Sequence, residues 1–379
     1  MYTISVIIPI YRGNKYIERL LDNLIRCYNN TKKEIRMEVI FVYDDPQEKR
    51  IIVQNKYHSL PIKIITLSNS EKRGIHYTRI NGLRNASGDY VLFLDQDDSI
   101  AEQYFESQLS KIGNAAVVIC NGIYRGDREI IWNSEEAKRI EDSENYFDTL
   151  TGIISPGQAL IRKSSIPEEW MNNILVGNYC DDALLWLLLK DKGEKIIVNK
   201  EKLYFHNEDG NNTSFQWKKT ANALEEMLAT VCDNGLLSDK HLRSLEKCVC
   251  EKVNKHRKYD ELEQKLDYIV RHTAQFKSLI EKKQPYRIAV YGYGIYGKKI
   301  LKYLEECGIE VSYVIDQNAQ AFEVAGLELK RLEDKLEPVD LIIITPVFDE
   351  ENIKAKLGSK SSARLLTVNE LQELIMEEP

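Results

Sequence analysis

The stretch Tyr90-Val91-Leu92-Phe93-Leu94-Asp95-Gln96-Asp97-Asp98 passes from an apolar run directly into three carboxylates. The run Tyr90–Leu94 is short and rich in strand-forming residues, which predicts a buried β-strand. Asp95 and Asp97 are two residues apart, so in extended chain both side chains can face one ligand. Clustered carboxylates repel one another unless a cation lies between them, and Mg²⁺ and Mn²⁺ favour carboxylate and phosphate oxygens. We predict a metal–diphosphate site at this strand end; the alternative is an acidic turn that caps a helix starting near Ser99.

The chain around this stretch alternates between strand-like and helix-like segments. Apolar runs that predict further strands are Ile4–Ile10, Met37–Tyr43, Ile62–Leu67, Ala115–Cys120, Lys195–Val198 and Lys202–Phe205. Helical spacing of apolar residues follows Asn14, a candidate N-cap, and recurs over Tyr77–Arg84 and Asp182–Lys190. This alternation predicts an α/β domain with a mostly parallel sheet, over residues 1–215. Ligands of such sheets bind at the carboxyl ends of the strands, where the three carboxylates lie.

Two further segments follow. Residues 216–284 contain no proline, one glycine, and 14 Lys and Arg against 11 Asp and Glu, so they carry +3 while the remainder carries −10. Their helical periodicity predicts a solvated connector of two or three helices, or a docking face for an anionic membrane or a partner. Residues 285–379 return to alternating strands and helices, which predicts a small α/β domain.

Composition restricts the class of protein. With 379 residues, 43% hydrophobic, the chain is long and apolar enough for two or three folded domains and is not intrinsically disordered. A net charge of −7 and a pI of about 5.6 argue against wholesale nucleic-acid binding. The longest apolar stretches are far shorter than the roughly 20 residues of a membrane helix. No cleavable signal is expected, and seven scattered cysteines without a CxxC pair predict reduced thiols in a cytoplasmic protein.

Three other polar clusters could carry chemistry. Asp181-Asp182 opens an apolar helix. These are either first-turn carboxylates favoured by the helix dipole or a general base whose pKa is raised by its neighbour. Asp44-Asp45-Pro46 ends a strand and is either a turn or an acceptor for a nucleobase. His206 follows a strand and is either a packed histidine or a metal ligand.

The order of these motifs resembles the family 2 glycosyltransferases with the GT-A fold, over roughly residues 1–215. The matching motifs are Ile7-Ile8-Pro9-Ile10-Tyr11, Tyr43-Asp44-Asp45, Arg73-Gly74 with Arg79 and Gly82, Asp95-Gln96-Asp97-Asp98, and Asp181-Asp182. No single motif is decisive, but five in the right order at compatible spacing are specific.

The resemblance implies a role for each matching position. On the donor side, it implies that Pro9 and Tyr11 line the nucleotide site and that Asp45 or Asp44 contacts the base. It further implies that Gly74 lets the backbone approach the nucleotide and that Arg79 anchors the sugar or diphosphate. It also implies that Asp95 and Asp97 hold the metal and the donor diphosphate, that His206 adds a metal or diphosphate contact, and that Asp182 is the base, supported by Asp181.

The reaction that the resemblance implies is a single inverting displacement. A hydroxyl acceptor attacks the sugar of a nucleotide-sugar, with Mn²⁺ or Mg²⁺ at the diphosphate. The nucleotide implied is UDP, because it is the most frequent one in the family. The setting implied is the synthesis of cell-surface polysaccharide or glycoconjugates. A lipid-carried acceptor would bring the enzyme to the cytoplasmic face of the membrane, and a homo-oligomer is compatible with the sequence.

The C-terminal segment carries a second motif, Gly292-Tyr293-Gly294-Ile295-Tyr296-Gly297, between a predicted strand and a predicted helix. Asp316 ends the next strand, 19 residues after Gly297, as in the dinucleotide fingerprint. This segment resembles Rossmann-like tail domains found beside sugar-modifying enzymes. It could bind NAD or another nucleotide, or retain the scaffold for a structural, oligomerisation or docking role. Two alternative functions remain: an NAD-dependent sugar oxidoreductase or epimerase, and a non-catalytic nucleotide-sugar-binding module.

Overall fold

The computed structural model describes residues 1–50, 62–124, 130–131, 134–150, 153, 155–207, 216–281, 287–317, 323–324 and 326–378. The chain forms two compact units, Met1–Asn254 and Lys255–Pro379, and the division falls inside helix α9 (Asp239–Arg271). The domain boundaries predicted after residues 215 and 284 border or lie in the segments 208–215 and 282–286, outside the described residues. They stay predictions.

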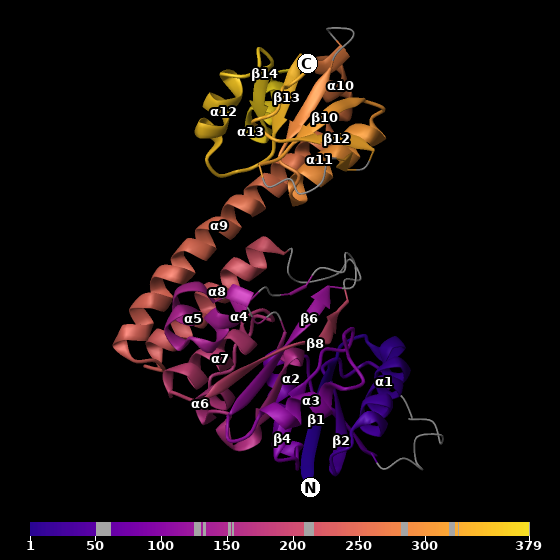
Figure 1. The fold of residues 1–379 in the computed structure, drawn as a ribbon, viewed down its shortest axis with the longest axis vertical. Helices are drawn as coiled ribbons and strands as arrows, with labels where there is room; N and C mark the ends of the chain where they lie inside the picture. Colours follow the sequence, from indigo (N-terminus) through magenta and orange to yellow (C-terminus); the bar gives the residue numbers. More distant parts are fainter. Residues whose placement is uncertain are drawn as a thin grey trace. The chain divides into compact units, whose positions relative to one another are not determined.

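The first unit is an α/β domain (Figure 1). Its strands are β1 (Tyr2–Ile10), β2 (Ile35–Tyr43), β3 (Ile62–Ser68), β4 (Tyr90–Phe93), β5 (Ser99–Ile100), β6 (Val117–Tyr124), β7 (Ala159–Arg162) and β8 (Ile196–His206). Its α-helices are α1 (Ile17–Asn30), α2 (Ile75–Asn85), α3 (Tyr104–Lys111), α4 (Ser134–Glu141), α5 (Ser143–Thr149), α6 (Glu168–Asn172), α7 (Asp181–Asp191), α8 (Trp217–Asp233) and the start of α9. Short 3₁₀ helices are η1 (Asn14–Tyr16), η3 (Pro156–Gln158) and η4 (Lys163–Ser165).

The strands form one sheet in the order β3-β2-β1-β4-β7-β6-β8-β5. Strands β3, β2, β1 and β4 are parallel, whereas β7 is antiparallel to β4 and β6. The chain leaves β1 toward β2 on one side and later returns as β4 on the other, so a topological switch point lies beside β1. Open α/β sheets bind their ligands in the crevice at the carboxyl ends of the strands next to such a point.

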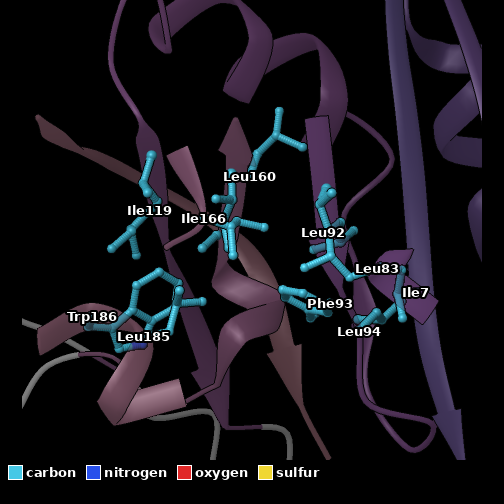
Figure 2. Packing of buried hydrophobic residues seen from close by; sticks show 14 of the residues in the cluster. Ile7, Leu83, Leu92, Phe93, Leu94, Ile119, Leu160, Ile166, Leu185 and Trp186 are labelled. Carbon is cyan, nitrogen blue, oxygen red and sulfur yellow. The ribbon is translucent and has the colours of Figure 1, made fainter. Parts of the chain in front are cut away.

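Burial in the core of the first unit explains why the sequences of β1 and β4 are mostly apolar. Every residue of β4 and residues 4–10 of β1 are buried, which requires cover on both faces of the sheet. Helix α2 packs against β1 and β2, and α3 packs against β6 and β8. Figure 2 shows side chains from β1, β4, β6, β7, α2 and α7 filling this core, among them Ile7, Leu83, Phe93 and Trp186.

Two local predictions are wrong. Asn14 is not the N-cap of α1, because η1 comes first and the helix starts at Ile17 without a side-chain cap. The Asn14 side chain instead accepts a hydrogen bond from the hydroxyl of Tyr43 at 2.8 Å. The two strands predicted over residues 195–205 are one strand, β8. Register shifts against β6 near Asn121 let β8 pass its exposed polar residues without breaking.

The second unit has its own sheet, in the order β11-β12-β10-β9-β13-β14. The strands are β9 (Ile288–Tyr291), β10 (Val311–Ile315), β11 (Glu323–Val324), β12 (Leu327–Lys330), β13 (Leu341–Ile344) and β14 (Arg364–Thr367). The helices are the end of α9, α10 (Thr273–Glu281), α11 (Ile295–Glu306), α12 (Glu350–Gly358) and α13 (Val368–Glu377). Only β11 is antiparallel to its neighbour among the described strands of this sheet.

The helices of the predicted connector contribute to two cores. Leu224 and Met227 of α8 and Val249 of α9 are buried in the first unit. Ile269 of α9 and Phe276 of α10 are buried in the second unit. None of the helices in the described part of the chain combines the length and apolar character needed to cross a bilayer.

Gly82 of α2 tests how closely this helix must approach the sheet. A β-carbon at Gly82 would lie 2.4 Å from Cγ2 of Ile7 and 3.2 Å from Cγ2 of Val42. We expect Gly82→Ala to lower the free energy of unfolding of the first unit by about 1–3 kcal/mol through overpacking. All four tryptophans lie between residues 132 and 217, so tryptophan fluorescence during urea denaturation follows this unit alone.

The matched control is Gly358→Ala in α12, where a β-carbon meets open space. We expect it to leave the urea midpoint of the first unit unchanged. A wild-type midpoint for Gly82→Ala would contradict the close packing of α2 on β1.

Candidate active site

A cleft of about 860 Å³ opens at the carboxyl ends of β1, β2 and β4, beside the switch point. Nine of the eleven predicted site residues line it: Pro9, Tyr11, Asp44, Arg79, Asp95, Asp97, Asp181, Asp182 and His206. Asp45 and Gly74 are not among the lining residues. The cleft therefore brings together nine predicted residues that are up to 197 positions apart in the sequence.

Strand register explains this convergence. Ile10 at the end of β1 lies opposite Tyr43 at the end of β2, so Tyr11 and Asp44 leave the sheet side by side. Ile7 lies opposite Phe93 of β4, which places Asp95 beside the last residues of β1. Parallel pairing aligns the three strand ends on one side of the sheet, where β1 is followed by Tyr11, β2 by Asp44, and β4, after Leu94, by Asp95.

Arg79 of α2 is the centre of the site. Its guanidinium donates from Nη1 to Asp181 Oδ2 and from Nη2 to Asp95 Oδ1, both at 2.6 Å. The side chains of Arg79 and Asp181 are only 4% and 3% exposed. Burial would lower the pKa of Arg79, but the two carboxylates more than offset it and raise the pKa. Arg79 thus holds the end of β4 and the start of α7 in one buried ion-pair network, an arrangement that the sequence did not reveal.

The Asp95 carboxylate is held on both oxygens. Oδ1 accepts from Arg79, and Oδ2 accepts from the hydroxyl of Ser155 at 3.2 Å. Ser155 in turn belongs to a capping box at the start of η3, with Gln158 as its partner. Burial raises the pKa of Asp95, and the Arg79 guanidinium only partly offsets this rise.

Asp182 differs from its neighbour Asp181. Asp181 is buried and bonded to Arg79, whereas Asp182 lines the cleft, is half-buried, and accepts a 2.8 Å bond from the main-chain amide of Ala183. Burial, followed by the charge of Asp181, raises the pKa of Asp182 to about 7, with Arg79 acting in the opposite direction. A carboxylate with this pKa can exchange a proton near neutral pH, as a general base must.

Asp98 fastens the end of β8 to the acidic turn. It is fully buried and accepts hydrogen bonds from the hydroxyl of Tyr204 and, at 3.0 Å, from the main-chain amide of Asn207. His206 lies between them, with Nδ1 at 3.4 Å from Asp98. Burial would lower the pKa of His206, but the hydrogen bond and charge of Asp98 more than offset it, and the pKa is raised.

Asp44 organises the loop before α2. One carboxylate oxygen accepts from the amide of Arg73 at 2.8 Å and the side chain of Asn69 at 2.9 Å. The other oxygen accepts from the amide of Gly74 at 3.1 Å. Gly74 has φ +85°, a left-handed conformation that favours glycine, and a β-carbon there would lie 2.8 Å from Oδ1 of Asn178.

Tyr11 lines the cleft, and Asp45 follows Asp44 outside the lining. Asp45 accepts a bond from the amide of Gln47 and pairs with Arg12 at 3.6 Å. Tyr11 is 36% exposed, and Lys72 lies over its ring at 4.4 Å from the centroid. Gln96 holds the main chain of Tyr11 with two bonds, one from the amide and one to the carbonyl.

The residues present fit a divalent metal ion that arrives with a diphosphate. In the described ranges, no three His, Cys, Asp or Glu side chains are gathered so as to hold a metal ion by themselves. Mg²⁺, however, is usually held by one or two carboxylates together with substrate phosphates and water. Asp95 and Asp97 line one cleft and supply such hard oxygen ligands, whereas the Nδ1 of His206 already faces Asp98.

Several residues of the cleft were missed from the sequence. They are Arg12, Lys15, Tyr16, Lys72, Ile75, Thr78, Pro156, Asn178, Tyr179 and Thr220, besides Ile10, Gln96 and Asp98 within quoted motifs. Most lie on loops or at helix starts, where no periodicity marks the direction of a side chain. The position of Gln96 between the two aspartates was the one available signal.

The glycine motif of the second unit forms the predicted turn between β9 and α11. Gly292 has φ +95°, and a β-carbon at Gly297 would lie 1.9 Å from the carbonyl oxygen of Gly292. Asp316 does not stand free at the end of β10, because its Oδ2 accepts a 2.7 Å bond from the amide of Tyr293. Nucleotide binding at this motif stays a prediction.

Comparison with known proteins finds similarity in the first unit. The model of Glycosyl transferase family 2 matches residues 5–170. "Glycosyltransferase GlyA" of Streptococcus pneumoniae is 25% identical over 260 residues, which cover 63% of this chain and 36% of that protein. "Minor teichoic acid biosynthesis protein GgaB" of Bacillus subtilis is 27% identical over 243 residues, 62% of this chain and 26% of that protein. The chain thus spans little more than a third of the one and about a quarter of the other.

Among solved structures, Staphylococcus aureus TarS 1–349 in complex with UDP-GlcNAc superposes with a TM-score of 0.49 at 16% identity. The match covers 68% of this chain and 72% of that one. At this level the likeness supports no statement about the ligands of this chain.

The sheet topology and the carboxylate-lined cleft define an α/β domain with a candidate ligand site at its switch point. The chain carries a family 2 glycosyltransferase domain with a GT-A-type fold, which confirms the resemblance noted in the sequence. The matched region ends at residue 170, before Asp181, Asp182 and His206.

The buried network predicts a strong dependence of stability on Arg79. We expect Arg79→Met to lower the free energy of unfolding of the first unit by about 3–5 kcal/mol, because Asp95 and Asp181 lose their shared counter-charge. The pKa of Asp95 should rise further, so the folded state keeps a proton that the unfolded state has released. The deficit should therefore grow as pH rises through the acidic range.

Urea denaturation followed by tryptophan fluorescence between pH 4 and 8 measures this effect. The double variant Arg79→Met/Asp181→Asn also removes the charge of Asp181, which is unpaired in Arg79→Met. It should therefore recover part of the lost free energy of unfolding. A deficit below about 1 kcal/mol at neutral pH would show that the network is not a strong constraint.

Proposed function

We propose that this chain is an inverting, metal-dependent glycosyltransferase that moves a sugar from a nucleotide-sugar to an acceptor hydroxyl. The observation that carries the proposal is the cleft of the first unit, which gathers Asp95, Asp97 and Asp182. Two of these carboxylates suit a metal–diphosphate, and the third has a pKa of about 7. The three together supply a base for the acceptor and a site for the leaving group.

The proposed reaction is one displacement at the anomeric carbon. The acceptor oxygen forms a bond to that carbon while Asp182 accepts the hydroxyl proton. The bond between the anomeric carbon and the donor phosphate oxygen breaks, and its electron pair leaves with the nucleoside diphosphate. General-base catalysis of this kind contributes about 10² to 10⁴ in rate.

The other residues of the site hold these groups in place. Arg79 keeps the Asp95 carboxylate and the start of α7 at a fixed separation, and it leaves Asp182 without a direct bond to a cation. Asp95 and Asp97 would hold Mn²⁺ or Mg²⁺, which when bound offsets negative charge on the departing diphosphate. Asp181 supports Asp182 through its charge, which contributes to the raised pKa of the base.

Donor and acceptor are proposed by class. The exposed ring of Tyr11, with Lys72 beside it, suits a nucleobase and an anionic phosphate, and we propose a UDP-linked sugar as the donor. The relative named for minor teichoic acid biosynthesis favours a cell-surface polymer or glycoconjugate as the acceptor. All seven cysteines are free thiols, which favours a reaction in the cytoplasm, at the face of the membrane when the acceptor is lipid-borne.

Asp182→Asn tests the base. We expect transfer to fall by about 10² or more while donor binding is kept, because the amide cannot accept the proton. In the wild type, kcat should drop about tenfold per pH unit below pH 7 and level off above it, because Asp182 acts only when deprotonated. Release of UDP from UDP-sugars with Mn²⁺ measures both effects. Unchanged turnover in Asp182→Asn would remove this residue from the base role.

Asp97→Ala tests the metal site. We expect the stabilisation of the protein by UDP to require Mn²⁺ or Mg²⁺ in the wild type and to weaken markedly in the variant. A thermal-shift plate with nucleotide-sugars, each with and without metal, measures this, and NAD without metal on the same plate tests the oxidoreductase alternative. Wild-type affinity for UDP–Mn²⁺ in Asp97→Ala would reject the metal-site assignment.

A further inference from the structure

The segment 175–179 ends two residues before Asp181, the first of the two acidic residues of α7, and each of its residues makes a hydrogen bond to another part of the first unit. The amide of Leu175 donates to Nδ1 of the buried His76 at 2.9 Å. At the other end, the hydroxyl of Tyr179 donates to the side chain of Gln216 at 3.0 Å. Asn178 accepts from the first amide of α2, that of Ile75, at 3.0 Å. A loop this fully bonded is ordered before any ligand arrives.

The middle of this segment is held by one carboxylate. Glu226 of α8 accepts from the amide of Val176 at 2.6 Å with one oxygen, and from the amide of Gly177 at 2.9 Å with the other. A β-carbon at Gly177 would lie 2.8 Å from the Glu226 carboxylate and 3.2 Å from Cβ of Ala223. Glycine at this position therefore permits the close approach of the segment to α8.

The segment and α8 form one wall of the cleft. Asn178 and Tyr179 line it together with Thr220 of α8, while Val176 is 81% exposed. The donor side of the cleft is built from the ends of β1, β2 and β4. Asp182, three residues after Tyr179, must face the acceptor hydroxyl, so side chains next to it border the path of the acceptor. Helix α8 lies beyond residue 170, outside the matched family region.

We propose that Glu226 is a positioning residue that fixes the segment 175–179 as the acceptor-side wall of the active site, and thereby sets the affinity for the acceptor rather than for the donor. The proposal rests on the proposed function. Glu226 touches neither substrate nor reacting atoms; it acts through the two amides that it holds. The ordered wall reduces the conformational freedom that acceptor binding would otherwise have to remove.

The test uses the full chain and the variants Glu226→Ala, Gly177→Ala and Glu225→Ala. The first removes both hydrogen bonds, and the second keeps the carboxylate but forces the segment away from α8. The third changes the exposed neighbour on the same helix and is the matched control. Glu226→Gln keeps one accepting oxygen and should give an intermediate result.

Hydrogen–deuterium exchange reads the wall directly. Peptides over residues 173–180 should exchange about tenfold faster or more in Glu226→Ala and Gly177→Ala, because hydrogen bonds to a charged group are lost. Peptides over residues 88–100 should exchange as in the wild type, which excludes general unfolding. Unchanged exchange over residues 173–180 in Glu226→Ala would overturn the proposal that Glu226 orders this segment, independently of the kinetic results.

Kinetics then separate acceptor from donor. The probes are UDP-glucose and UDP-GlcNAc with Mn²⁺, with water as the acceptor and with a panel of methyl glycosides as acceptors. In Glu226→Ala and Gly177→Ala, UDP affinity and hydrolysis of the donor should stay within about twofold of the wild type, and the KM for the glycoside acceptor should rise about tenfold or more. A parallel loss of donor and acceptor affinity, or a wild-type acceptor KM, would reject the proposal.

Failure of the proposed function gives a different result. A wild-type chain that neither binds UDP with Mn²⁺ nor cleaves either donor would reject glycosyl transfer. The exchange measurement still decides whether Glu226 orders the wall.

Discussion

The double ion pair of Arg79 is the constraint on which the active site depends. Asp95 and Asp181 are 16 and 102 positions from Arg79 in the sequence, yet each accepts a hydrogen bond of 2.6 Å from one of its terminal nitrogens. The network joins α2, the end of β4 and the start of α7. A buried guanidinium with carboxylates on both sides tolerates little displacement, because any separation leaves a charge without a partner in a medium of low dielectric constant.

This arrangement divides the acidic residues into different environments. Asp95 and Asp181 share a cation, whereas Asp182 has a main-chain amide as its direct partner and Asp181 as a repelling neighbour. Burial and the charge of Asp181 raise the pKa of Asp182, while Arg79 acts in the opposite direction. The pairing of Arg79 with Asp95 and Asp181 holds the end of β4 and the start of α7, which carries Asp182, beside one cleft.

The features that could be predicted from the sequence are those that depend on local residue patterns. The strands that lead to Tyr11, Asp44 and Asp95 were predicted because each contains an apolar run that is followed by a polar residue. The neighbours of Arg79 could not be predicted, because pairing over 102 positions leaves no mark in local periodicity. The same holds for Glu226, whose spacing in α8 looks like that of any solvent-facing residue. Asp98 and His206 were each visible in the sequence, but their contact was not, because they lie 108 positions apart.

The glycine motif of the second unit shows why a fingerprint alone does not establish a ligand. Its first glycine is required by a left-handed backbone, with φ +95° at Gly292, and its third by the 1.9 Å approach of a Gly297 β-carbon to the Gly292 carbonyl. Both requirements arise from joining β9 to α11. The acid that the fingerprint assigns to a ribose, Asp316, accepts a bond from the amide of Tyr293 within the turn itself. The turn, its glycines and its acid are thus explained by the packing of strand and helix, and a function of this unit has to be argued from side chains rather than from the motif.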